Sequence, residues 1–139
     1  MKALLIAIGN PLRGDDAVAQ ATIELIPASP GLETFSVMQL TPELSAQIAT
    51  YDLVVFLDAD LLAQEVSLGP VEPPPLTPGF THVSTPEEIL ALARSLYSFA
   101  GRGLTCRLPI TSLAPGEPLS SRARHSAAQA ARLLSQTLA

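Results

Sequence analysis

The sequence predicts one α/β domain, residues 1–139, with a mostly parallel, twisted sheet of about five strands and helices on both faces. Three observations lead to this three-layer fold class. Apolar runs alternate with segments of helical periodicity, and the clearest runs are apolar on both faces, as buried parallel strands are. The chain has 139 residues, 47% of them hydrophobic, which is enough for one sizeable core and too short for two ordinary domains.

The N-terminal part of the chain predicts a strand, a helix and a second strand. The apolar run Ala3–Ile8 ends at Gly9 and is typical of a buried strand. Residues 16–26 place apolar side chains at helical spacing and are closed by Pro27, so a short amphipathic helix is expected. The second strand is expected at Glu33–Val37.

The middle of the chain predicts a helix, a buried strand and a proline-rich connection. Thr41 is the expected N-cap of the helix and Pro42 its first residue. The apolar strand Leu53–Leu57 follows and stops at Asp58. Five of the thirteen prolines then fall within residues 65–79. Because proline cannot donate to a sheet ladder, at most an edge strand is expected there, at Val66–Val71.

A capping box predicts the start of the next helix. Thr85 is its N-cap, Pro86 takes the first helical position and Glu88 follows three residues after Thr85. This helix should end between Tyr97 and Gly101. The remaining elements are a strand at Leu104–Leu108 and a closing helix at Ser120–Leu138.

Charge and composition narrow the class of partner. The net charge of −5 and the absence of tryptophan argue against nucleic-acid binding, which needs basic surfaces and stacking side chains. Twelve of the thirteen acidic residues precede Ile89, and six of the eight basic residues follow it. This asymmetry predicts either two differently charged solvated faces or a basic C-terminal third that meets an acidic partner.

Other features of the sequence bear on its location. No apolar run approaches the roughly 18 residues that a membrane span needs. The N-terminus has one lysine and a short strand-like run in place of a signal peptide. We therefore expect a cytoplasmic protein with no membrane partner. The single cysteine, Cys106, excludes an internal disulfide framework and a multi-cysteine zinc site, so a metal would need carboxylates or histidines.

Polar residues follow the predicted strands where parallel sheets place their ligands. These positions lie beyond the carboxyl ends of the strands, where the strand order reverses. The candidates are Asn10, Asp15, Asp16, Asp58, Asp60 and His82. We expect their side chains to converge on one edge of the sheet.

The turn GNPLRGDD, residues 9–16, has the glycine spacing of a phosphate-binding P-loop. Where a P-loop has Lys followed by Ser or Thr, however, this chain has Asp15 and Asp16. Two carboxylates would occupy the favourable field of the helix N-terminus and repel a phosphate. The turn therefore argues against nucleotide binding.

Carboxylates at this edge suit a cation instead. Two Asp oxygens and one His nitrogen from separate loops would form an open site for a borderline divalent ion such as nickel or zinc. The alternative is that Asp16 is only an acid at a helix N-terminus and Asp58 only a loop acid. The residue types alone leave both interpretations open.

Three segments of the chain add a family resemblance. IAIGNPLRGDDAVA, VVFLDAD and THVSTPEEILAL occur in this order over most of the sequence. They match a strand with a Gly-Asn turn and an acidic pair, an apolar strand ending in Asp-Ala, and a Thr-His pair ahead of a helix. Together they resemble the hydrogenase maturation proteases, which trim the C-terminal extension of the [NiFe]-hydrogenase large subunit after nickel insertion.

The resemblance implies a reaction and a set of site residues. The family's nickel-binding and catalytic trio falls on Asp16, Asp58 and His82, and its Gly-Asn turn falls on Gly9 and Asn10. The nickel would belong to the substrate, a hydrogenase large-subunit precursor, although zinc or another divalent ion could occupy the site. A water polarised by the metal or by a free carboxylate would then attack the scissile carbonyl.

The other candidate residues are less suited to chemistry. Asp60 is the less favoured ligand, because Asp58 is the residue that precedes the Ala of the Asp-Ala pair. Cys106 lies in an apolar strand and is expected to be a buried, inert thiol. His125, in the basic last helix, is expected to be an exposed surface residue. The sequence has no G-x-S-x-G elbow and no HExxH pair.

Three alanines depart from the family pattern. Ala7, Ala17 and Ala19 stand where glycines are usual, and methyl groups at the helix start could narrow the path of a substrate backbone. Two alternatives stay open, and the altered glycines motivate the first of them. One is a non-catalytic metal-binding or scaffold protein of the same fold that acts in hydrogenase assembly. The other is a small-molecule binding module, which the acidic character of the crevice supports less well.

Overall fold

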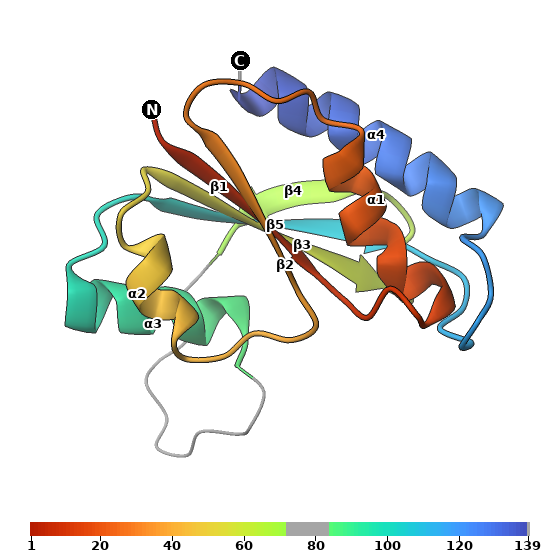
Figure 1. The fold of residues 1–139 in the computed structure, drawn as a ribbon, viewed down its shortest axis with the longest axis horizontal. Helices are drawn as coiled ribbons and strands as arrows, with labels where there is room; N and C mark the ends of the chain where they lie inside the picture. Colours follow the sequence, from red (N-terminus) through yellow and green to blue (C-terminus); the bar gives the residue numbers. More distant parts are fainter. Residues whose placement is uncertain (72–83, 139) are drawn as a thin grey trace.

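The computed structural model describes residues 1–71 and 84–138. Five strands form one sheet in the order β2-β1-β3-β5-β4 (Figure 1). Neighbouring strands are parallel except for β4, which pairs antiparallel with β5 at the edge, where its proline-rich sequence predicts it. The strands are β1 (Ala3–Ile8), β2 (Leu32–Val37), β3 (Leu53–Asp60), β4 (Ser67–Pro70) and β5 (Arg102–Pro109).

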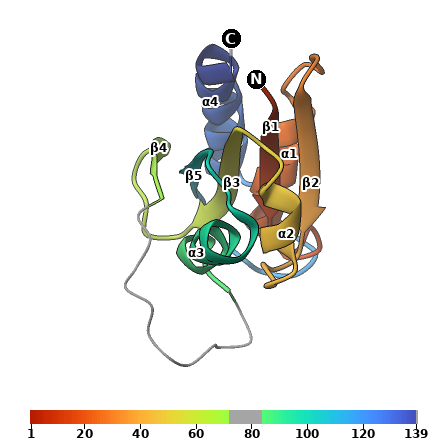
Figure 2. The same cartoon turned by 90° about the vertical axis from the view of Figure 1, so that its left-hand side faces the viewer.

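Helices cover both faces of the sheet, as Figures 1 and 2 show. The helices α1 and α4 pack together on one face, and α2 and α3 pack together on the other. The helical elements are the 3-10 helix η1 (Gly14–Ala17), α1 (Val18–Glu24), α2 (Leu44–Ile48), α3 (Pro86–Tyr97) and α4 (Ser121–Leu138). This arrangement confirms the predicted fold class. Within the described ranges, no helix combines the length and the apolar character needed to cross a bilayer.

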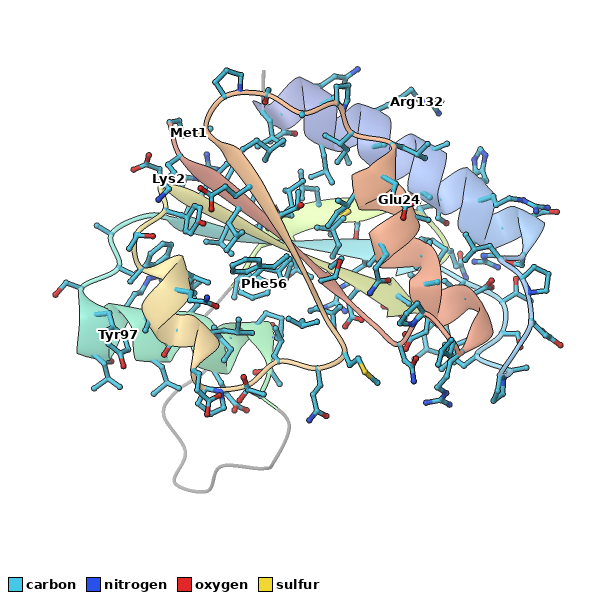
Figure 3. All side chains as sticks on the ribbon, viewed as in Figure 1. Met1, Lys2, Glu24, Phe56, Tyr97 and Arg132 are labelled. Atoms are coloured by element: carbon cyan, nitrogen blue, oxygen red, sulfur yellow. The ribbon has the colours of Figure 1, made fainter. Side chains whose placement is uncertain are left out.

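Alternation along the central strands divides the core between the two faces. In β3, Val55 and Leu57 pack on the side of α1 and α4, whereas Val54 and Phe56 pack on the side of α2 and α3. All four side chains are fully buried, and Figure 3 shows Phe56 between the sheet and α2 and α3. The same alternation places Asp58, two residues further on, on the face of α2 and α3.

The structure corrects two predicted helix starts. The segment at 16–26 is divided between η1 and α1. Thr41 is not the N-cap of α2, which begins at Leu44. The preceding turn is closed by bonds of the i to i+3 type, from the amides of Leu44 and Ser45 to the carbonyls of Thr41 and Pro42. In both places the first turn of the expected α-helix has 3-10 hydrogen bonding instead, so the α-helix itself begins later in the sequence.

Other boundaries agree closely with the sequence. Thr85 caps α3 through its Oγ1, which accepts the amide of Glu88 at 3.2 Å, and Pro86 is the first helical residue. The helix ends at Tyr97, within the predicted range. The last strand, expected at Leu104–Leu108, is longer by a few residues at its start and by one at its end.

The strand order reverses around β1. The chain continues from β1 to β2 on one side and to β3 on the other, so the crevice between β1 and β3 is the topological switch point of the sheet. The two strands are in register as far as the pair Ile8 and Asp58. The turn after β1 carries Asp16. Two of the predicted site residues therefore lie where an open α/β sheet binds its ligand.

Candidate functional site

An open pocket of about 330 Å³ lies at this switch point. The end of β1, the loop after β2, the end of β3 and the start of α3 form its walls. Asp16 and Asp58 are its carboxylates among the described residues, and Met38 and Leu40 add apolar surface. The structure thus brings together two of the three residues that the sequence analysis assigns to a metal site.

Gly9 forms the turn that brings Asp16 to the end of β1. Its φ is +150°, and a Cβ placed on it would lie 2.1 Å from the carbonyl oxygen of Asp16. Only glycine leaves room for this approach of two backbones. The amide of Asn10 then donates to Oδ2 of Asp16 at 2.6 Å. The Gly9–Asn10 pair therefore determines where the Asp16 carboxylate lies.

The side chain of Asn10 serves the turn itself. Its Oδ1 accepts the amide of Leu12 at 3.0 Å, and its backbone carbonyl accepts the amide of Arg13 at 3.0 Å. These bonds form a compact turn of the kind that Asn favours. Asn10 acts at the site through its main-chain amide.

The first acid of the pair, Asp15, is buried in the protein and does not line the pocket. Its side chain is 1% exposed. It accepts the amides of Thr111 at 2.8 Å and Ser112 at 3.2 Å, and both the amide and the hydroxyl of Ser120 at 2.7 Å. Burial acts to raise the pKa of Asp15, but these hydrogen bonds together outweigh it and lower the pKa. Asp15 therefore ties the turn to the segment that precedes α4.

Gly14 allows that connection to form. Its φ is +54°, and a Cβ placed on it would lie 2.9 Å from the carbonyl oxygen of Ala114 and 3.1 Å from that of Ser112. The amide of Asp15 also donates to the carbonyl of Ser112 at 3.0 Å. The two glycines that resemble a P-loop thus have separate tasks: Gly9 admits the backbone of Asp16, and Gly14 admits the segment at 112–114.

Asp58 is partly buried at the end of β3. The pKa of Asp58 is raised to about 6, first by burial and then by the charge of Asp16, with a smaller contribution from Asp60, whereas the amide of Ala59 and the charge of Arg107 act in the opposite direction. The influence of Asp16 means that the two carboxylates of the pocket repel each other when both are ionised. A cation between them would replace this repulsion with attraction.

Asp60 is engaged in the loop that follows β3. Its Oδ1 accepts the amides of Leu62 at 2.8 Å and Ala63 at 3.2 Å, and its Oδ2 lies 3.5 Å from Nη1 of Arg107. Asp60 does not line the pocket. Asp58 is therefore the carboxylate of β3 that shares the pocket with Asp16.

His82 lies outside the described residues, so the third predicted ligand is not placed. Ser84, Thr85 and Pro86, which follow it in the sequence, line the pocket. Among residues 1–71 and 84–138, no group of three or more His, Cys, Asp and Glu side chains could hold a metal ion. A metal in this pocket needs a ligand in addition to Asp16 and Asp58.

The remaining candidates occupy the positions expected for residues without a chemical role. Cys106 is fully buried in β5, and burial raises its pKa to about 12. This confirms that the thiol is buried, and a raised pKa disfavours the reactive thiolate. His125 is exposed on α4 and lines a different surface hollow from the one that contains Asp16.

The three alanines at glycine positions have ordinary backbone conformations. None has a positive φ. Ala7 and Ala19 are fully buried, in β1 and α1, so their methyl groups cannot face a passing peptide. The question whether a methyl group narrows the path of a substrate is therefore confined to Ala17, which is partly buried at the end of η1.

Gln20 was not predicted as a site residue. It lies on α1, and its Nε2 donates to the carbonyl of Gly9 at 3.0 Å. Its spacing from Asp16, four residues along the helical segment, could have indicated it, because residues at i and i+4 share a helix face. The partners of Asp15 were not predicted either, because Ser120 is 105 residues away and no local sequence signal points to it.

Comparisons with known proteins give a result for the fold. No family model and no curated protein matches the sequence. The [NiFe] hydrogenase maturation protease HycI of Thermococcus kodakarensis KOD1 is similar over 99% of this chain and 92% of its own, with a TM-score of 0.76 and 20% identity. The hydrogenase maturating endopeptidase HybD of E. coli is also similar over 99% of this chain and 92% of its own, with a TM-score of 0.71 and 17% identity.

A third solved structure gives the same result. The hydrogenase 2 maturation peptidase of Thaumarchaeota archaeon SCGC_AB-539-E09 is similar over 99% of this chain and 98% of its own, with a TM-score of 0.68 and 20% identity. These neighbours are named as proteases, and at such identities the likeness concerns the fold. The chain therefore has the fold of the [NiFe]-hydrogenase maturation proteases.

Proposed function

We propose that this protein is an endopeptidase that removes the C-terminal extension of a [NiFe]-hydrogenase large-subunit precursor after nickel insertion. The observation that carries this proposal is the meeting of Asp16 and Asp58 in an open pocket at the switch point of the sheet. Fold neighbours that are named maturation endopeptidases support the reaction class, and the three sequence motifs support the substrate.

The metal would arrive with the substrate. An open pocket with two carboxylates can accept a cation that another protein already holds, because its remaining ligands can come from the precursor. Oδ2 of Asp16 is bonded to the amide of Asn10, which leaves Oδ1 to face the metal. Asp58 and His82 would complete the recognition. Nickel is the ion that the proposal expects, and zinc could replace it in the same set of ligands.

The chemistry proposed is hydrolysis of one peptide bond. Binding of the metal places the scissile carbonyl next to the pocket, and a water polarised by the metal or by a free carboxylate adds to the carbonyl carbon. The C–N bond then breaks, and a proton from the water ends on the released amino group. Cys106 cannot replace the water as nucleophile, because its thiol is buried in the core.

The test is cleavage of purified precursor in two forms, with and without nickel, followed by mass spectrometry. Loss of the C-terminal extension from the nickel-loaded form alone is the expected result. Asp16→Asn, Asp58→Asn and His82→Ala should each abolish cleavage while the fold is retained. The matched control is Asp60→Asn, which keeps an oxygen for the loop amides of Leu62 and Ala63 and should cleave at the normal rate.

Other outcomes would overturn the proposal. Equal cleavage of both forms would mean that the metal is not recognised, and unchanged cleavage by the Asp16 and Asp58 variants would mean that this pocket is not the site. Binding of the loaded precursor without any cleavage would instead support the scaffold alternative. The cytoplasmic location expected from the sequence stays a prediction, which fractionation of cells can test.

A further inference from the structure

Gln20 is connected to Asp16 through a single peptide group. Its Nε2 donates to the carbonyl oxygen of Gly9 at 3.0 Å. The N–H of the same peptide, which belongs to Asn10, donates to Oδ2 of Asp16 at 2.6 Å. The Gly9–Asn10 peptide is therefore held at one end by a side chain of α1 and at the other end by a carboxylate of the pocket.

We propose that Gln20 is a positioning residue for the Asp16 carboxylate and so for recognition of the precursor's metal. This inference rests on the proposed function. A hydrogen bond to the carbonyl of a peptide polarises the group and strengthens its N–H as a donor. Gln20 thus both orients the Gly9–Asn10 peptide and shortens its bond to Asp16, without touching the substrate.

The turn has a specific need for such a residue. Gly9 has a φ of +150° and no side chain to restrict it, so its peptide can rotate more easily than that of any other residue. Its N–H is bonded to the carbonyl of Val37 in β2 at 2.9 Å. The bond from Gln20 fixes the carbonyl that follows. Together the two bonds hold Gly9 between β2 and α1.

The orientation of the Gln20 amide supports this role. A carbonyl oxygen only accepts, so Nε2 and not Oε1 must face Gly9. This leaves Oε1 buried and without a hydrogen-bond partner in the part of the chain that the structure describes. A buried unpaired acceptor destabilises the fold. The Nε2 of Gln20 therefore contributes a bond at the site, whereas its Oε1 lowers the stability of the fold. The effect of Gln20 on function can thus differ from its effect on folding.

Two variants remove the donor in different ways. Gln20→Met keeps the length of the side chain and removes both the donor to Gly9 and the unpaired Oε1. These two losses have opposite effects on thermal stability, so its net change should be small. Gln20→Glu keeps the shape and places an oxygen opposite the Gly9 carbonyl. The matched control is Glu24→Gln, an exposed residue of the same helix.

The first readout needs no precursor. In the wild type the amide proton of Asn10 should resonate far downfield, because its bond to a carboxylate is short. Gln20→Met and Gln20→Glu should move this resonance upfield, whereas Glu24→Gln should leave it in place. An unchanged Asn10 resonance in both Gln20 variants would overturn the inference, whether or not the protein proves to be a protease.

The second readout is cleavage of nickel-loaded precursor. In the proposed function Asp16 would bind the metal of the precursor before the reaction begins, so Gln20→Met should raise KM by about 10- to 100-fold and change kcat less. In an Asp16→Asn background, Gln20→Met should have no further effect on precursor affinity. Additive effects would show that Gln20 acts apart from Asp16. If the wild type does not cleave, the proposed function fails, and the Asn10 resonance still decides whether Gln20 holds the turn.

Discussion

Ser120 donates both its amide and its hydroxyl to the carboxylate of Asp15, at 2.7 Å each, across 105 residues of sequence. The amides of Thr111 and Ser112 donate to the same carboxylate. One buried side chain therefore satisfies three backbone amides of the segment before α4. The turn that carries Asp16 is held in place by its neighbour in the sequence.

We predict that Asp15→Ala lowers the free energy of unfolding by about 3 kcal/mol or more, because buried amides would lose their acceptor. Urea unfolding at pH 7 measures this effect. Glu24→Gln is the control and should change stability by less than about 0.5 kcal/mol. If Asp15→Ala lowered the free energy of unfolding by less than about 0.5 kcal/mol, water or a local shift of the chain would have replaced the carboxylate as acceptor.

The same bonds predict a dependence on acid. Hydrogen bonding lowers the pKa of Asp15 in the folded protein below the ordinary value of 3.8. The stability that Asp15 contributes is therefore fully present above 3.8 and is lost as the pH falls through the folded pKa. The difference in unfolding free energy between the wild type and Asp15→Asn should be constant at neutral pH and shrink in strong acid. A difference that grows in acid would contradict this sign.

A methyl group at Gly9 should disrupt the site and the fold together. The Cβ would lie 2.1 Å from the Asp16 carbonyl oxygen, and the φ of +150° is unfavourable for alanine. We expect Gly9→Ala to lower the free energy of unfolding by about 3 kcal/mol or more. The matched control is Gly69→Ala, where no atom lies within 4 Å of the new Cβ and the change should be small. Equal effects in urea unfolding would rule out the close approach.

Asp58 should show the opposite linkage to Asp15. Its pKa is raised from 3.8 to about 6, so the folded state loses stability relative to the unfolded chain as the pH rises through this window. Asp58→Asn removes that penalty. The stability of this variant should match that of the wild type in acid and exceed it above pH 6. The shift in pKa sets an upper limit of about 3 kcal/mol on the gain, and solvent screening of the partly exposed Asp58 should keep it below that limit. Denaturant unfolding at several pH values measures the difference, and a less stable variant at pH 7.5 would contradict the prediction.

Replacing Ala19 with glycine tests the role of its buried methyl group. Ala19 is a buried residue of α1 that packs into the core, so Ala19→Gly should lower stability by about 1 to 2 kcal/mol through lost burial and helix propensity. It should not increase cleavage of the precursor. Ala17→Gly is the companion variant at a partly exposed position. A faster reaction in Ala19→Gly would show that the core residue does obstruct the substrate.

Much of the fold could be predicted because its central strands are buried on both faces. The apolar run Ala3–Ile8 matches β1 without error, and the capping residues Thr85 and Pro86 set the start of α3. The predicted start of α2 is wrong, because Thr41 followed by Pro42 indicates the beginning of a helix without distinguishing an α-helical first turn from a 3-10 turn.

The site could be predicted in part for a topological reason. Asp16 and Asp58 follow strands that a parallel sheet places side by side, so their meeting follows from the chain order. The role of Asp15 could not be predicted from chain order. In the sequence, a buried structural aspartate cannot be distinguished from a metal ligand, and only the hydrogen bonds from Ser112 and Ser120 show which one Asp15 is. Gln20 was not predicted because it bonds to a backbone carbonyl, and every residue type has one, so the sequence does not reveal the partner.

The bonds between Asp15 and the segment before α4 also have a consequence for synthesis of the chain. The ribosome makes Asp16 and Asp58 first, whereas Thr111 and Ser120, which anchor the turn beside Asp16, follow Asp15 by 96 and 105 residues. Contacts between such distant segments form late and slowly. A nascent chain that stops before Thr111 would carry both carboxylates, but the turn that positions Asp16 would lack its anchor, so the site takes its geometry only after the segment at 111–120 has been made.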